Sequence, residues 1–364
     1  MQYVHRSRIA FLSLILAASL TIACNSSGKR SAHVVTINGA GSTFINPAMT
    51  RWISDFQASH PGVQINYQSI GSGGGIQQLK QGLVDFAASD AALDNAKLGD
   101  MPPLVQIPDS GGPVCITYNL PELKAPLRLS GTTLASIYLG EMKSWRDSAI
   151  QKDNDGLRLP DRTIAVVHRS DGSGTTNIFT MYLAMASQAW SNKVGQGMSV
   201  SWPVGVGGKG SEGLTGTVKQ TPGSIGYVEL AYAKANHLPV AQVHNQAGAW
   251  IEPTAAAATA AIDAFQRELA NDVRSPVVDP PASAKEAYPI SGLTYLLVPK
   301  QAKDEDKQQI LKEFVQYIVS EGQASAQSLQ YATLPLSLAG RDQMLLGEIQ
   351  EGSQRAPNDQ PASK

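Results

Sequence analysis

The residues best suited to bind a ligand lie in one short loop, Arg169 to Thr175, which reads Arg-Ser-Asp-Gly-Ser-Gly-Thr. The loop follows the apolar run 164–167 and opens into a helical pattern that includes Phe179 and Tyr182. A helix start presents unpaired backbone N–H groups, and its dipole favours negative charge. With an arginine and hydroxyl groups at the same place, the loop predicts a binding site for a small oxyanion. The alternative is an ordinary glycine-rich turn with an Arg–Asp surface pair.

Three further stretches of the chain have a similar context. Residues 39–44 (Gly-Ala-Gly-Ser-Thr-Phe) form a second glycine turn with hydroxyls between a strand and a helix, and residues 71–74 (Gly-Ser-Gly-Gly) form a third. Asp90 ends a brief apolar run at 86–88. Each of them taken alone is compatible with a purely structural role. Together they predict one polar site assembled from separate parts of the chain.

Hydrophobic patterns predict the elements that position these turns. Residues 48–56 have helical spacing, whereas 63–67 alternate between apolar and polar side chains as in a half-buried strand. Strand, glycine turn and helix in repetition imply parallel α/β layers, whose ligands bind beyond the carboxyl ends of the strands. The same patterns predict strands at 86–88, 113–119, 164–168, 224–229 and 294–298, a short helix at 76–80, a helical alanine run at 255–258, and a helix at 310–318.

The first residues predict export from the cytoplasm. Arg6 and Arg8 precede the apolar run 9–20, which is short for a membrane span, so residues 1–23 resemble a signal peptide. Thr21-Ile22-Ala23-Cys24 resembles a lipobox, although Thr21 stands where leucine is usual. We expect Cys24 to be lipidated and residues 24–33 to form a flexible tether. A plain cleavage site that releases a soluble periplasmic protein is the alternative.

Composition limits the classes of function. Cys24 and Cys115 are the only cysteines in 364 residues, so no disulfide framework is expected, and Cys115 is predicted to be a buried thiol. Without residues 1–23 the chain has 27 basic and 30 acidic residues, a net charge of −3. That balance gives no global field for nucleic acid, so an oxyanion must be held by local groups. The chain length suggests two domains.

The sequence resembles the periplasmic phosphate-binding proteins of bacterial phosphate ABC importers. The matching stretches follow the family order and cover the chain from about residue 36 to 335. They are GAGSTF at 39–44, NYQSIGSGGGIQQL at 66–79, VDFAASDAAL at 84–93, IYLGEMKSW at 137–145, IAVVHRSDGSGTTNIFTMYLA at 164–184, WPVGVGGKG at 202–210 and PGSIGYVELAYAKANHL at 222–238.

The resemblance implies a two-lobed periplasmic binding protein of type II. Each lobe is expected to be a mixed, mainly parallel sheet flanked by helices, with inorganic phosphate enclosed between the lobes. Residues 34–110 plus 289–350 are expected to form lobe I and 111–288 lobe II, followed by a polar tail at 351–364. The implied partners are the membrane permease and ATPase subunits of the importer. The protein is expected to be a monomer that is not an enzyme and needs no cofactor.

The resemblance also assigns roles to single residues. Arg169 is the one cationic contact, and Asp171 braces its guanidinium. Asp90 is the selectivity residue. The remaining phosphate ligands are expected to be Ser42, Thr43, Phe44 through its backbone N–H, Ser72, Ser173, Gly174 and Thr175, with the Ser42 contact the least firmly implied.

The chemistry of Asp90 fits a ligand that carries a proton. A carboxylate accepts a hydrogen bond from the P–OH of phosphate, whereas sulfate has no proton to donate. Two like charges about 4 Å apart repel by about 4 kcal/mol at an effective dielectric near 20. That energy corresponds to roughly a thousandfold discrimination against sulfate. A helix cap is the alternative role for Asp90.

Other functions have weaker support in the sequence. Gly207-Gly208-Lys209-Gly210 lacks the Ser or Thr of a nucleotide P-loop, and neither Ser72 nor Ser173 lies in a hydrolase elbow. The six histidines have no metal-ligand spacing. An exported phosphatase remains the alternative from another class, and a receptor for sulfate or molybdate is the alternative within the binding class.

Overall fold

The structure is a computed structural model that describes residues 34–302 and 304–350. The expected signal peptide at 1–23, the lipidated Cys24, the tether and the tail at 351–364 lie outside the described residues. The described residues all belong to one compact unit.

The central element is an eight-stranded mixed sheet with the strand order β2-β1-β3-β11-β4-β8-β6-β7. β1 is parallel to both β2 and β3, and β6 is parallel to both β7 and β8, whereas the pairs that involve β4 or β11 are antiparallel. The strands are β1 (Val35–Gly41), β2 (Val63–Ser69), β3 (Phe86–Ser89), β4 (Leu104–Tyr118), β6 (Ala165–Arg169), β7 (Val206–Gly208), β8 (Ser224–Glu229) and β11 (Ser291–Pro299).

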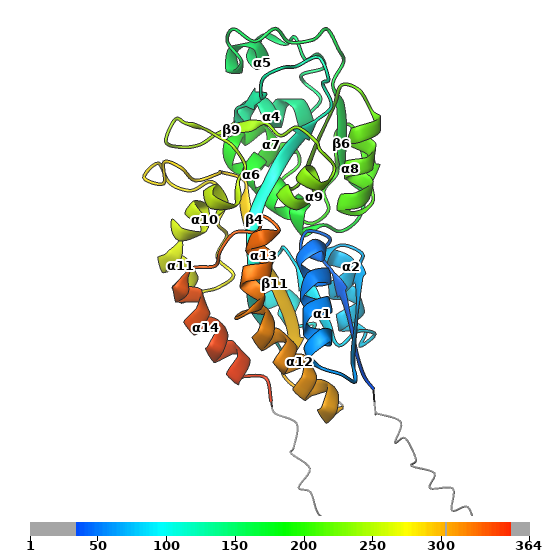
Figure 1. Cartoon of the computed structure of the whole chain (residues 1–364). Coiled ribbons are helices and arrows are strands. Elements are labelled where there is room, and N and C mark those ends of the chain that lie inside the picture. The colour runs from blue at the N-terminus through cyan, green and yellow to red at the C-terminus, as the bar shows by residue number, and fades with distance from the viewer. Residues whose placement is uncertain (1–33, 303, 351–364) are drawn as a thin grey trace, which may run out of the picture. The chain divides into compact units, whose positions relative to one another are not determined.

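The long strand β4 lies in the middle of this sheet and pairs with a different strand along each part of its length. Its residues 104–113 pair with β11, and its residues 114–118 pair with β8. We call β2, β1, β3, β11 and the first part of β4 the first half-sheet, and the second part of β4 with β8, β6 and β7 the second half-sheet. Figure 1 shows β4 in cyan, continuing from the elements of one half-sheet into those of the other.

A second, three-stranded sheet has the order β10-β9-β5. Its strands are short: β5 (Arg128–Leu129), β9 (Gln242–His244) and β10 (Trp250–Ile251). The buried side chains of Leu129 and Val243 join the main hydrophobic core, which attaches this small sheet to the second half-sheet.

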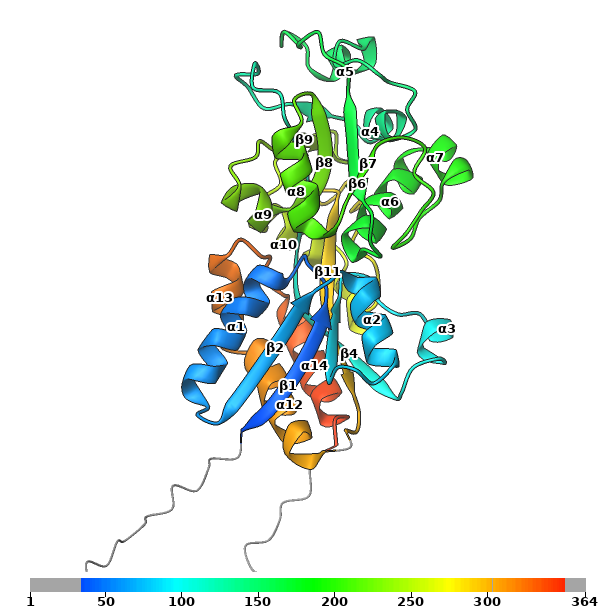
Figure 2. The ribbon, with the colours of Figure 1, turned by 90° about the vertical axis from the view of Figure 1, so that its right-hand side faces the viewer.

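Helices cover both faces of the first half-sheet because successive strand residues point to opposite sides. Ile37 of β1 packs in one buried cluster with Trp52 and Phe314, whereas Ala40 packs in another with Leu79. Figure 2 shows these helices around β1 and β2. They are α1 (Asn46–Ser59), α2 (Ser72–Lys80) and α12 (Glu305–Ile318), accompanied by α3 (Asn95–Leu98), α13 (Gly322–Ser328) and α14 (Leu336–Gly347).

The second half-sheet is flanked in the same way. Leu183 of α6 and Leu214 of α8 are fully buried and share the core with Val167 and Ile225 of the strands. The helices of this part are α4 (Gly131–Tyr138), α5 (Ser148–Asp153), α6 (Gly174–Ala186), α7 (Gln188–Lys193), α8 (Gly210–Gln220) and α9 (Leu230–Ala235).

Two helices that the sequence analysis groups with lobe II pack on the first half-sheet. α10 (Ala255–Asp263) and α11 (Gln266–Asn271) place Ile262 and Leu269 in the cluster that contains Leu79 and Leu297. Their apolar faces need a partner, and this face of the first half-sheet provides one.

The predicted elements are present, with shifted ends. The helix predicted at 48–56 is α1, the strand at 164–168 is β6, and the alanine run at 255–258 begins α10. The strand predicted at 113–119 is only the last third of β4. The mixed α/β architecture with flanking helices agrees with the predicted fold class.

Cys115 is a free, buried cysteine in β4, as predicted. Burial raises the pKa of its thiol well above the usual value, so the group stays protonated and unreactive. Among the described residues, no helix combines the length and the apolar content needed to cross a bilayer.

Candidate functional site

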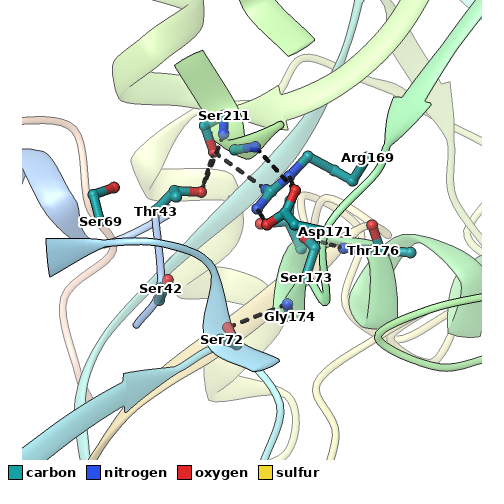
Figure 3. Close-up of polar contacts among 12 residues, drawn as sticks. Ser42, Thr43, Ser69, Ser72, Arg169, Asp171, Ser173, Gly174, Thr176 and Ser211 are labelled. Carbon is teal, nitrogen blue, oxygen red and sulfur yellow. Dashed lines mark hydrogen bonds and ion pairs between the residues drawn. The ribbon is translucent and has the colours of Figure 1, made fainter. Parts of the chain in front are cut away.

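The predicted site residues come from both half-sheets and converge on one place. The turn after β1, the start of α2 and the end of β3 supply residues from the first half-sheet, and the loop from β6 into α6 supplies those from the second. Figure 3 shows Ser42, Thr43 and Ser72 facing Arg169, Ser173 and Gly174. The predicted site residues are nearly or fully buried, except that the Asp171 side chain keeps a little exposure.

Asp90 is the centre of the contacts across the two half-sheets. Its carboxylate accepts a hydrogen bond from the Ser42 hydroxyl at Oδ1 and one from the Thr175 hydroxyl, 3.1 Å away, at Oδ2. Ser42 belongs to the turn after β1, whereas Thr175 lies in the first turn of α6. The residue therefore binds groups from both sides, which an isolated helix cap would not do.

The charge state of Asp90 follows from its surroundings. Burial raises the pKa of the carboxyl to about 6, although the hydrogen bonds from Ser42 and Thr175 and the charge of Arg169 act in the opposite direction. At pH 7 to 8 the group is therefore mainly ionised, and it is an acceptor for a hydroxyl of a ligand.

Arg169 ends β6 and is held in place by Asp171. Its Nε and Nη2 atoms lie 2.8 and 2.5 Å from the two carboxylate oxygens, a bidentate ion pair. Burial alone would lower the pKa of Arg169, but Asp171 outweighs it and the pKa is raised. The pKa of Asp171 is lowered, since its contacts with Arg169 outweigh its own burial. The bracing role expected for Asp171 agrees with this geometry.

Ser72 links the start of α2 to the start of α6. Its hydroxyl oxygen accepts hydrogen bonds from the backbone N–H groups of Asp90 and Gly174, both at 3.2 Å. A Cβ at position 174 would lie 2.6 Å from the Cβ of Asp90, so only glycine fits there. Because both lone pairs of Ser72 are engaged, its proton is the part of the hydroxyl that is left to donate to a ligand.

The other predicted donors also have defined positions. Ser173 is the N-cap of α6, where its hydroxyl oxygen accepts from the N–H of Thr176 at 3.1 Å. The Phe44 ring is buried and its carbonyl accepts from Tyr331, whereas its N–H donates to no group among the described residues. Thr43 is hydrogen bonded to Ser211 through its hydroxyl, 2.8 Å from the Ser211 Oγ atom.

Two buried residues of the site were not found by the sequence analysis. Ser211, in the first turn of α8, contacts Thr43 and lies 3.5 Å from a guanidinium nitrogen of Arg169. Glu229, at the end of β8, accepts from the Ser211 hydroxyl at 3.1 Å. The turn before α8 takes part as well, because the N–H of Gly210 donates to Asp171 at 2.9 Å. The sequence feature that could have indicated these contacts is the glycine-rich turn at 207–210. This turn is no nucleotide P-loop, but it leads into the start of α8, where Ser211 lies.

The site offers many hydrogen-bond donors with little net positive charge. The one buried cation named above is already paired with Asp171, and the other donors are hydroxyls and backbone N–H groups. Dehydrating an anion is costly, so a closed site must supply several donors, and neutral dipoles can do this. Within residues 34–302 and 304–350, no cluster of three or more His, Cys, Asp or Glu side chains is arranged to hold a metal ion.

Buried carboxyl groups should make the stability of this protein depend on pH. Burial raises the pKa of Asp109 to about 7 and that of Asp342 to about 8, in addition to Asp90. The folded state then binds protons more tightly than the unfolded state, so its stability decreases as pH rises from about 4 to about 8. Asp90 alone contributes about 3 kcal/mol.

Thermal melting of the ligand-free protein between pH 4.5 and 8.5 checks this. Asp109→Asn should flatten the profile, since Asp109 accepts a hydrogen bond from Thr294 while its second oxygen has no partner among the described residues. A melting temperature that rises toward pH 8 in the wild-type protein would contradict the expected sign.

Comparison with known proteins agrees with the fold. The family model described as PBP superfamily domain matches residues 27–322. Phosphate-binding protein PstS of Xylella fastidiosa (strain Temecula1) is 44% identical over 305 residues, which are 84% of this chain and 83% of the relative. Phosphate-binding protein PstS of Haemophilus influenzae is 40% identical over 84% of this chain and 90% of its own.

A solved structure gives the same fold at lower identity. The high-affinity periplasmic phosphate-binding protein PfluDING, bound with phosphate, has a TM-score of 0.66 and 22% identity, and the match covers 85% of this chain and 93% of that chain. A divided mixed sheet with a buried polar site between its halves is the arrangement of a type II periplasmic binding protein. Within that class, the chain belongs to the PstS family of the PBP superfamily.

Proposed function

We propose that this chain binds inorganic phosphate and delivers it to a phosphate ABC importer. The observation that carries the proposal is that one site contains two buried groups of opposite charge. Asp90 is a carboxylate that accepts hydrogen bonds, and Arg169 is a cation. Such a site suits an anion that still carries a proton. The names of the relatives in the PstS family support the same ligand.

In the proposed complex, Arg169 faces the phosphate charge and Asp90 accepts from its P–OH group. Asp171 holds the guanidinium and does not contact the ligand. The proposed phosphate ligands are Ser42, Thr43, Phe44 through its N–H, Ser72, Asp90, Arg169, Ser173, Gly174 and Thr175. Their convergence from two half-sheets supports this assignment.

We further propose that the ligand controls closure of two lobes built on the first and the second half-sheet. The lobes expected from the sequence are 34–110 plus 289–350 and 111–288, and we now group α10 and α11 with the first lobe because they pack on its half-sheet. Phosphate contacts residues of both lobes only when they are closed, so its differential affinity shifts the equilibrium to the closed form. The permease then recognises the closed form. The hydrogen bond from Gly174 to Ser72 and the one from Thr175 to Asp90 support closure at this place.

The proposed location is the periplasm. PfluDING, which has the same fold, is described as a periplasmic protein. The apolar run at 9–20 and the lipobox-like 21–24 support export and a lipid anchor on Cys24. We also propose that the protein is a monomer. The intact mass of the mature protein distinguishes a lipidated Cys24 from a plain cleavage site.

Calorimetric titration of the mature protein with phosphate, sulfate and molybdate at pH 7.5 tests the function. We expect binding of phosphate and at least a hundredfold weaker binding of sulfate. Preference for sulfate or molybdate would favour a receptor for another oxyanion. Turnover of a chromogenic phosphate ester that is lost in Ser173→Ala would favour an exported phosphatase.

A further inference from the structure

Ser211 joins the two half-sheets directly. Its N–H donates to the Thr43 hydroxyl oxygen at 3.2 Å, and the two hydroxyl oxygens lie 2.8 Å apart. Thr43 is in the turn after β1, and Ser211 is in the first turn of α8. Both residues are 1% exposed, so water does not compete for these bonds. Figure 3 shows the pair beside the Arg169–Asp171 ion pair.

The direction of these hydrogen bonds follows from Glu229. A serine hydroxyl has one proton and two lone pairs. Glu229 Oε2, 3.1 Å away, accepts the Ser211 proton, so both lone pairs of Ser211 remain for donors. Arg169 Nη1 approaches at 3.5 Å, and Thr43 lies on the remaining side. The Thr43 hydroxyl is therefore oriented to donate to Ser211.

Ser211 is the one side chain among the described residues that donates a hydrogen bond to the Glu229 carboxyl group. Glu229 is 1% exposed, and its Oε1 atom has no hydrogen-bond partner among the described residues. Burying a carboxyl group with incomplete hydrogen bonding is costly. Its contact with Ser211 gives a reason for the acid to be at this position, because that contact orients the one hydroxyl that bridges to Thr43.

We propose that Thr43, Ser211 and Glu229 form a latch that stabilises the closed form and slows the release of the ligand. The inference rests on the proposed function and adds Ser211 and Glu229, which do not themselves need to contact phosphate. Because the Thr43 hydroxyl proton is donated to Ser211, Thr43 would donate to phosphate through its backbone N–H. Thr43 reaches Ser211 only when the half-sheets are together. The bond therefore stabilises the closed form alone, and its loss shifts the equilibrium toward the open form.

Stopped-flow measurement of phosphate binding by tryptophan fluorescence tests the latch. Ser211→Ala removes the hydroxyl but keeps the backbone bond to Thr43. We expect the release rate constant to rise roughly 5- to 100-fold, the effect of losing one buried hydrogen bond, while the association rate constant changes less than about threefold. Glu229→Gln keeps an oxygen acceptor, so its release rate should lie between those of the wild-type protein and Ser211→Ala.

Thr217→Val is the matched control. Thr217 lies on the same helix, and its hydroxyl donates only to the Gly213 carbonyl of α8. It should release phosphate at the wild-type rate. Ser211→Ala leaves the Glu229 carboxyl without its hydrogen bond from Ser211, so we expect it to melt at a lower temperature than Thr217→Val, and the release rates are compared at a temperature at which both variants are folded. If the wild-type protein binds phosphate but Ser211→Ala releases it no faster than the control, or loses affinity only through association, the latch is wrong. If the wild-type protein binds no phosphate, the proposed function itself fails.

Discussion

Arg169→Ala is expected to raise the dissociation constant for phosphate by two to three orders of magnitude. The change removes the buried cation of the site and leaves the partly buried Asp171 carboxylate without its cation, so that it repels the ligand. Truncating one partner of a buried, hydrogen-bonded charge pair at a binding interface costs about 2–5 kcal/mol of binding free energy. Calorimetric titration at pH 7.5 measures the effect, and thermal melting shows that the variant is folded.

A second substitution separates the two parts of this loss. Arg169→Ala with Asp171→Asn removes the unpaired charge as well, so part of the affinity should return. Arg146→Ala is the control, since Arg146 pairs with Asp161 while both side chains are more than half exposed. Its affinity should equal that of the wild-type protein. Unchanged phosphate affinity in Arg169→Ala would exclude Arg169 from the site.

Asp90→Asn should reduce the discrimination between phosphate and sulfate by up to roughly a thousandfold. The ionised carboxylate repels sulfate by about 4 kcal/mol at contact distance, and a neutral amide does not. Phosphate should lose less, because the amide oxygen still accepts a hydrogen bond. Competition of sulfate against phosphate, measured for both proteins at pH 8, gives the ratio of affinities directly.

Asp94→Asn provides the matched control. Asp94 is an exposed N-cap of α3 whose side chain accepts from the N–H of Lys97, and asparagine caps a helix equally well. Sulfate rejection should stay at the wild-type level in this variant. If Asp90→Asn rejects sulfate as strongly as Asp94→Asn does, the selectivity role assigned to Asp90 is wrong.

Much of the fold could be predicted because local sequence patterns agree with it. Trp52 and Phe56 have helical spacing and face the core of α1, and the apolar run at 224–229 is a fully buried strand. The first two thirds of β4 were missed. Pro108 and the pair Gly111–Gly112 normally argue against a strand, and the extended backbone there is stabilised by pairing with β11 and by a bridge between Gly111 and Ala332.

The parts of the site that could be predicted are those in which the residues of one short segment already indicate their role. Arg169 and Asp171 are two residues apart in a glycine-rich loop at a helix start, which indicates an anion site before any tertiary structure is known. Ser211 and Glu229 have no such local signal. Their role depends on Thr43, 168 residues from Ser211 in the chain. A contact between distant segments follows from packing, not from motif or spacing.

The strand shared by both half-sheets has a consequence for how the protein handles its cargo. β4 changes partner between Pro113 and Val114, directly after Gly111 and Gly112. A Cβ at Gly111 would lie 2.8 Å from Ile262 and 2.9 Å from the Gly292 carbonyl oxygen, so a larger residue does not fit there unless its neighbours shift, and a Cβ at Gly112 would press on the Phe44 ring at 3.2 Å. In the proposed closure, the opening movement would twist the backbone at this crossing. In the proposed mechanism, the rates at which phosphate binds and dissociates would therefore depend partly on a strand that contains none of the proposed phosphate ligands.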